Sequence, residues 1–175
     1  MTNLKEVMKK FDMTFSQKHR ESLINDAHDI LGTDRYLMLC VEEIAELINA
    51  IVNNEKDVNY IHTAEEIADV RNSINIILTI CDIKSSKIGK IDTKRRSKKQ
   101  TKLSILNNLS KAQQNISKFV RCRKDCDDKL LSALNMMSKA CYDAEILYKI
   151  KRKDIEKIEN IKFERLWNRL NNGEL

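Results

Sequence analysis

The sequence contains no proline and only three glycines among its 175 residues. These residues mark most turns of β-rich and loop-rich proteins, so their scarcity argues against such folds and against collagen-like or proline-rich chains. Aromatic residues make up only 5% of the chain, which leaves isoleucine and leucine to build a core. Apolar residues, at 42%, are numerous enough for that core and too numerous for a typical disordered chain. We therefore predict a single all-α domain over residues 1–175.

Long hydrophobic runs are also missing. The most apolar stretch, residues 74–81, is interrupted by Asn75 and Thr79 and is far shorter than the roughly 20 residues that a membrane span needs. The first residues lack the apolar core of a signal peptide. The five cysteines are odd in number, and most lie in apolar helical patterns, which is typical of buried thiols in a reducing compartment. We predict a soluble cytoplasmic protein with no membrane partner.

The positive charge, +6 overall, is concentrated in one segment. Residues 84–102 contain nine Lys and Arg against a single acid, Asp92, so the rest of the chain is slightly acidic. Residues 84–101 show no apolar periodicity, and we predict an exposed basic loop there. Three roles stay open for this loop: a solvated connector, a contact with the phosphates of a substrate, or a sequence-independent footprint on nucleic acid.

Apolar residues at helical spacing predict the secondary structure. Gly32 should end one helix, Thr33 or Asp34 should cap the next, and Gly173 should follow the last. Thr63 stands three residues before Glu66, which predicts a capping box. The predicted helices are 3–12, 15–31, about 34–53, about 63–83, about 102–122, about 127–150 and about 153–171.

The central helices form two successive hairpins, at residues 37–83 and 103–150. When the two are aligned, Asn108 and Lys111 stand where the first hairpin has Glu43 and Glu46. The second hairpin is therefore interpreted either as a degenerate copy that lost its acids or as an unrelated amphipathic hairpin, since any two such hairpins align about as well.

Acidic residues recur beside the apolar stripes of the first hairpin. Glu43 and Glu46 are three residues apart on one helix, and so are Glu66 and Asp69 on the next, which places each pair on one helix face. If the two stripes pack antiparallel, the four carboxylates meet at the rim of the shared core. They would repel one another at neutral pH unless a divalent cation neutralised them. Alternatively, the acids form solvated helix surfaces, with Glu66 serving the capping box.

Oxygen-only ligands select Mg²⁺, Mn²⁺ or Ca²⁺. Mg²⁺ keeps several waters and completes its shell with substrate phosphates, so such a site favours metal-assisted attack of water on a phosphate chain. The order Glu42-Glu43-x-x-Glu46, then Glu66-x-x-Asp69, resembles the motif of the all-α nucleoside triphosphate pyrophosphohydrolases. That superfamily includes the MazG-type enzymes, the dimeric dUTPases, the dCTPases and phosphoribosyl-ATP pyrophosphatase. The resemblance covers about residues 36–82.

The resemblance implies a helical bundle that hydrolyses nucleoside triphosphates, including deoxynucleotides, to the monophosphate and pyrophosphate and so adjusts the nucleotide pool. It implies that Mg²⁺, or Mn²⁺ in its place, is the cofactor, and that Glu43 orients or deprotonates the attacking water. Glu42 would be an outer-shell or second-metal carboxylate, and Asn72 and Ser73 would contact the substrate. The metal ligands implied in this way are Glu43, Glu46, Glu66 and Asp69.

Departures from the family narrow this interpretation. No histidine follows soon after Asp69, unlike in phosphoribosyl-ATP pyrophosphatase, and the acid-free second hairpin is more like the dimeric dUTPases. We expect a homo-oligomer, a dimer if the second hairpin is a degenerate copy and a tetramer if not. The base is left open, with Tyr36 and Tyr60 as aromatic candidates for stacking.

Two non-catalytic alternatives also remain. One is a helical nucleic-acid-binding protein that uses the basic loop 84–102 and is indifferent to neutralising Glu43 or Asp69. The other is a protein with the same acids that binds nucleotides without turnover.

Overall fold

A computed structural model describes residues 15–53, 60–89, 96–122 and 127–174. All regular structure in these ranges is helical, as the composition predicts, and none of these helices is long and apolar enough to cross a membrane. The predicted helix 3–12 lies outside the described residues. The elements are α2 (Gln17–Asn53), α3 (Tyr60–Ile80), the 3₁₀ turn η1 (Ser85–Lys87), α4 (Lys98–Arg121), α5 (Asp127–Tyr148) and α6 (Arg152–Asn172).

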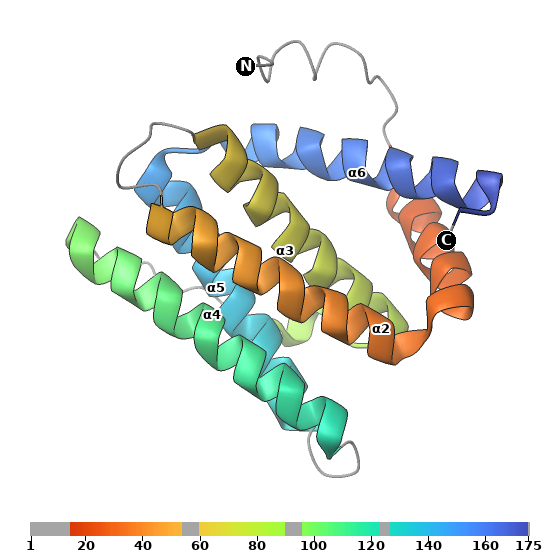
Figure 1. Ribbon diagram of the computed structural model, residues 1–175, viewed down its shortest axis with the longest axis horizontal. Coiled ribbons are helices and arrows are strands. Elements are labelled where there is room, and N and C mark those ends of the chain that lie inside the picture. The colour runs from red at the N-terminus through yellow and green to blue at the C-terminus, as the bar shows by residue number, and fades with distance from the viewer. Residues whose placement is uncertain (1–14, 54–59, 90–95, 123–126, 175) are drawn as a thin grey trace.

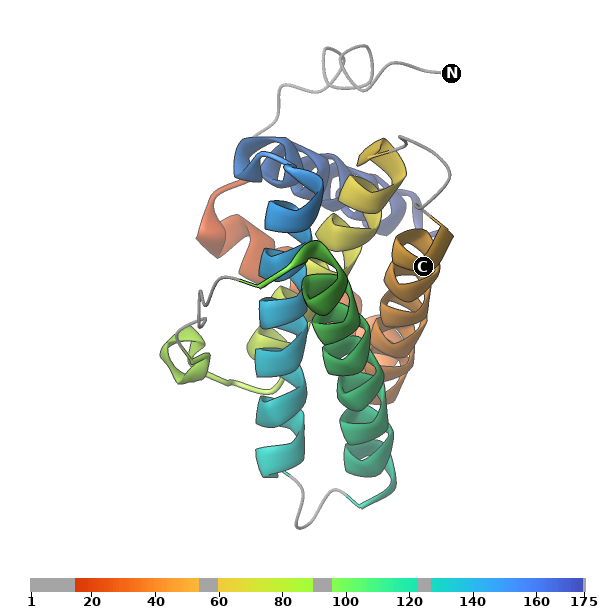
Figure 2. The ribbon, with the colours of Figure 1, turned by 90° about the vertical axis from the view of Figure 1, so that its left-hand side faces the viewer.

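Two helical hairpins pack face to face. The C-terminal part of α2 lies against α3, α4 lies against α5, and the hairpins meet through contacts of α2 with α4 and of α3 with α5. Figure 2 shows α4 and α5 side by side. The core between them is mostly isoleucine, leucine and alanine, as expected from the low aromatic content. Its largest fully buried members include Leu37, Ile44, Leu47, Ile51, Ile67, Ile77, Ile105, Leu109, Ile116 and Leu134.

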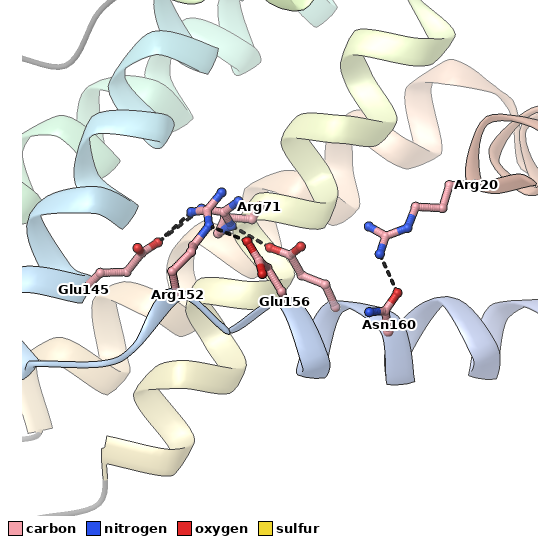
Figure 3. Close-up of polar contacts among 7 residues, drawn as sticks. Arg20, Arg71, Glu145, Arg152, Glu156 and Asn160 are labelled. Atoms are coloured by element: carbon pink, nitrogen blue, oxygen red, sulfur yellow. Dashed lines mark hydrogen bonds and ion pairs between the residues drawn. The ribbon is translucent and has the colours of Figure 1, made fainter. Parts of the chain in front are cut away.

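Helix α6 runs across one side of this bundle, over α3 and toward the N-terminal part of α2 (Figure 1). A second apolar cluster lies beneath it, in which Phe163 of α6 packs with Leu23 and Ile24 of α2. Arg20 of α2 donates a hydrogen bond to Asn160 (Figure 3), and its guanidinium lies 4.9 Å from the centre of the Phe163 ring. Helix α6 is thus fixed to α2 by both apolar and polar contacts.

Gly32 bends α2 between its two parts. Its φ of 75° and ψ of 162° are not helical, so the chain changes direction there while helical structure continues on both sides. This backbone region is open almost only to glycine. The prediction that Gly32 separates two helices is confirmed, and the bend lets residues 17–31 pack under α6 while residues 33–53 join the bundle.

Two local predictions were wrong. Helix α3 begins at Tyr60, so Thr63 lies inside the helix and is buried, and it forms no capping box with Glu66. The basic segment is not a loop to residue 101, because α4 begins at Lys98. Ser97 and Gln100 form a capping box there, which extends the helix into the lysine-rich sequence. Residues 90–95 of the predicted loop lie outside the described residues.

Candidate functional site

Three of the predicted carboxylates come together where α2 and α3 pack. One carboxylate oxygen each from Glu43, Glu46 and Glu66 lies within 4.8 Å of the other two. Glu66 is buried, Glu43 is partly buried and Glu46 is exposed, so the cluster opens to solvent on the Glu46 side. The i,i+3 spacing on α2 and the packing of α3 therefore produce the convergence that the sequence predicts, for these three residues.

The cluster is electrostatically strained. Burial, followed by the nearby carboxylates of Asp69 and Glu46, raises the pKa of Glu43 from its ordinary 4.5 to about 7. Burial and the same two neighbours also raise the pKa of Glu66. Both shifts show that a full set of negative charges is unfavourable in this space, which a cation would relieve.

Glu66 also has an unused acceptor. Its Oε1 pairs with Nδ1 of His62 at 3.2 Å, but its Oε2 is buried and accepts no hydrogen bond from the described residues. A buried carboxylate oxygen without a partner is costly. The donor set, three carboxylates with one unsatisfied buried oxygen, fits a hard divalent cation such as Mg²⁺ or Mn²⁺.

Asp69 is held differently from the prediction. Its Oδ2 forms an ion pair with Nζ of Lys162, which reaches it from α6. Burial is the largest influence on its carboxyl and raises the pKa of Asp69, while the lysine opposes that rise. Asp69 is not one of the three carboxylates that converge.

Glu42, the other predicted catalytic acid, is exposed on α2 and also lies outside the group of three. Tyr60 is exposed as well and is not part of the lining of the pocket beside the cluster.

A pocket of about 190 Å³ adjoins the acidic cluster, between α2, α3 and α6. Glu43 and Asp69 line it, as do the predicted substrate residues Asn72 and Ser73 of α3. Oδ1 of Asn72 and the hydroxyl of Tyr36 are buried and have no hydrogen-bond partner among the described residues. Five apolar residues also line it: Leu31, Leu39, Ile76, Phe163 and Leu166.

Two cations also line this pocket, and neither was among the predicted site residues. Lys162 and Arg169 are seven residues apart on α6, which places them on one face, and both line the pocket. The lining of the pocket therefore includes two carboxylates and two cations, and one of each, Asp69 and Lys162, form an ion pair. No pattern in residues 152–172 indicates that this helix crosses α3, so only the tertiary structure reveals their position.

An ion-pair network whose residues do not line this pocket anchors α3 between α5 and α6 (Figure 3). Arg71 donates from Nη1 to Glu145 at 3.1 Å and from Nε to Glu159 at 2.5 Å. Arg152 donates to the same Glu145 oxygen at 3.0 Å and to Glu156 at 3.3 Å. Arg71 follows Asp69 by two residues, so this network sets the position of the α3 segment that carries the acids.

Comparisons with models of protein families, with curated proteins and with solved structures find no match to this chain. The family resemblance of the acidic motif therefore stays a prediction.

Proposed function

We propose that this protein binds Mg²⁺ through Glu43, Glu46 and Glu66 and hydrolyses nucleoside or deoxynucleoside triphosphates to the monophosphate and pyrophosphate. One observation carries the proposal: three carboxylates converge beside a pocket, and one of them, Glu43, lines that pocket together with two cations of α6. A polyphosphate ligand needs both features, because a divalent ion neutralises its oxygens and basic side chains hold the remaining charge.

Each residue of the site has a separate role in the proposed reaction. When bound, Mg²⁺ supplies a Lewis acid and makes an attacking water more acidic. Glu43 orients that water and accepts its proton at a carboxylate oxygen. Asn72 and Ser73 contact the substrate from α3, and Lys162 and Arg169 hold phosphate oxygens from α6. Asp69 is the fourth ligand once it is free of Lys162.

The apolar wall of the pocket suits the base. Tyr36, already a candidate from the sequence, contributes an aromatic ring and an unpaired hydroxyl there. A nucleobase offers a flat apolar face together with hydrogen-bonding edges, which matches a lining of this kind.

The packing of the two hairpins favours a dimer among the homo-oligomers that the resemblance implies. In the four-helix bundle, the α4–α5 hairpin lies beside the acid-bearing α2–α3 hairpin within one chain. A second chain is then not needed to cover α2 and α3, as it would be in an assembly of single hairpins.

The deciding experiment measures pyrophosphate release from a panel of ribo- and deoxynucleoside triphosphates with Mg²⁺. We expect release from at least one of them and its loss in Glu43→Gln. Glu21→Gln is the matched control, because Glu21 is an exposed acid on the same helix whose side chain accepts a local hydrogen bond from Gln17. Loss of release in both variants would mean that the effect is not specific to the cluster.

The absence of release with every nucleotide, from a folded protein, would refute the hydrolase proposal. Metal-dependent nucleotide binding without turnover would then support a non-catalytic nucleotide-binding protein. Salt-sensitive binding of nucleic acid that is unchanged in Glu43→Gln would support a function of the basic residues 84–102.

A further inference from the structure

Lys162 lies beside the acidic cluster and forms an ion pair with one of its neighbouring carboxylates. Its Nζ pairs with Oδ2 of Asp69, and both side chains are largely buried, with exposures of 25% and 17%. Its charge also lowers the pKa of Glu43 and of Glu66, against the stronger effects that raise them. A single ammonium group therefore acts on three of the four carboxylates.

We propose that Lys162 is the built-in counter-cation of the cluster: it holds Asp69 when no divalent ion is present, and a divalent ion displaces it from Asp69. This inference depends on the metal-binding part of the proposed function and not on hydrolysis. It also accounts for the position of Asp69 outside the group of three, because the lysine draws its carboxylate toward α6.

The charges of Lys162 and of a divalent ion predict that the two compete for Asp69. A divalent ion bound beside Glu43 and Glu66 would face an ammonium group on a neighbouring carboxylate, and the two cations repel each other at short range. Asp69 gains more from a doubly charged ion than from the lysine. The ammonium group therefore has to leave Asp69 for that residue to become a ligand.

The lysine can move without its helix. Its four-carbon stem is flexible, so the ammonium group can turn into the adjoining pocket, which Lys162 already lines. Meanwhile Glu159 keeps α6 on Arg71, and Asn160 keeps it on Arg20. The exchange of cations thus needs a side-chain rotation rather than a shift of α6.

The test is a titration of the full chain with Mn²⁺ alone, without nucleotide, followed by electron paramagnetic resonance or calorimetry. We expect Lys162→Met to bind Mn²⁺ on the order of tenfold more tightly than the wild type, within the usual range of coupling between two competing ligands. Lys162→Gln, which removes the charge but keeps a hydrogen-bond donor, should shift the affinity in the same direction and serves if the Met variant does not fold.

Arg169→Met is the matched control. Arg169 also lines the pocket, but it donates to the backbone oxygen of Glu174. Removing this charge should change Mn²⁺ affinity much less, by about twofold. Equal gains in the Lys162 and Arg169 variants would overturn the proposal, because the effect would then be general electrostatics rather than competition for Asp69.

A double-mutant cycle tests whether Asp69 is the carboxylate for which Lys162 and the metal ion compete. In an Asp69→Asn background, Lys162→Met should no longer tighten Mn²⁺ binding, because the shared carboxylate is gone. Unchanged or weaker binding in Lys162→Met alone would overturn the counter-cation role and leave the hydrolase proposal intact. If neither the wild type nor Lys162→Met binds Mn²⁺, the metal site itself is refuted, and both proposals fail together.

Discussion

Arg71 of α3 and Glu159 of α6 form a 2.5 Å ion pair next to the ion pair between Asp69 and Lys162. The partners of the two pairs are two residues apart on α3 and three residues apart on α6. The two pairs have opposite polarity, since α3 supplies the cation in one and the anion in the other. Their reciprocal arrangement fixes the register between α3 and α6. The two pairs have different surroundings, because the Arg71–Glu159 pair belongs to the ion-pair network with α5 and the Asp69–Lys162 pair lies at the acidic cluster.

The first prediction concerns the ion pair between Arg71 and Glu159. Arg71→Met leaves the buried carboxylate of Glu159 without the guanidinium that pairs with it, and leaves buried Glu145 with Arg152 alone. Uncompensated buried charge is strongly destabilising, so we expect the free energy of unfolding to fall by roughly 3–5 kcal/mol. Urea denaturation measures this loss. Arg152→Met is the control, because Arg152 is about half exposed and should cost far less; similar losses in both variants would contradict a special role for Arg71.

Much of this architecture could be predicted from the sequence. The apolar stripes defined the helices, and the i,i+3 spacing of the acids on two neighbouring helices brought Glu43, Glu46 and Glu66 together. These features are local or involve adjacent helices, where a short connection leaves few ways to pack. Asn72 and Ser73, which the resemblance implies as substrate contacts, line the pocket beside the cluster.

The remainder depends on packing that local patterns do not encode. Lys162 reaches Asp69 because α6 crosses α3. The charged residues of α6 are typical of an exposed helix and do not indicate which helix it covers. Spacing alone suggested a capping box at Thr63, but capping depends on where the helix begins. Ser97 had the same spacing to Gln100 and does cap a helix, but the surrounding lysines concealed the apolar period.

The second prediction is a pH dependence of stability in the absence of metal. The pKa of Glu43 is raised from 4.5 to about 7, so between these values the folded state binds more protons than the unfolded chain. Stability must therefore fall as pH rises through this window. Thermal unfolding with a chelator at pH 5 and pH 7.5 measures the change. Glu43→Gln should flatten the dependence, and a wild-type protein that becomes more stable toward pH 7.5 would contradict it.

The third prediction is that Mg²⁺ opposes the loss of stability with rising pH. Metal binding requires the ionised carboxylates, so the metal stabilises the folded state more strongly at pH 7.5 than at pH 5. We expect the melting temperature to rise with Mg²⁺ concentration at pH 7.5 and to change little at pH 5. A rise of equal size at both pH values would indicate weak surface binding elsewhere rather than occupation of the cluster.

The fourth prediction concerns the bend in α2. At Gly32, φ is 75° and ψ is 162°, and a Cβ there would meet no atom within 4 Å, so any cost of Gly32→Ala arises in the backbone. We expect a loss of roughly 1–3 kcal/mol in the free energy of unfolding. Gly173→Ala is the control, because it ends α6 in the milder left-handed helical region and should cost less. Equal stability of wild type and Gly32→Ala would mean that the bend is not required.

The last prediction separates binding from folding at Tyr36. Its hydroxyl is buried and unpaired among the described residues, so Tyr36→Phe removes a polar group that the folded protein does not satisfy. Stability should stay the same or rise by about 1 kcal/mol. If the hydroxyl contacts the base of a bound nucleotide, the same variant should raise KM for the preferred nucleotide and leave weaker substrates almost unaffected, because only a ligand with a matching edge gains that hydrogen bond. Denaturation and steady-state kinetics on the one variant give both quantities. An equal rise in KM for all nucleotides would show that Tyr36 contributes shape to the pocket rather than selection of the base.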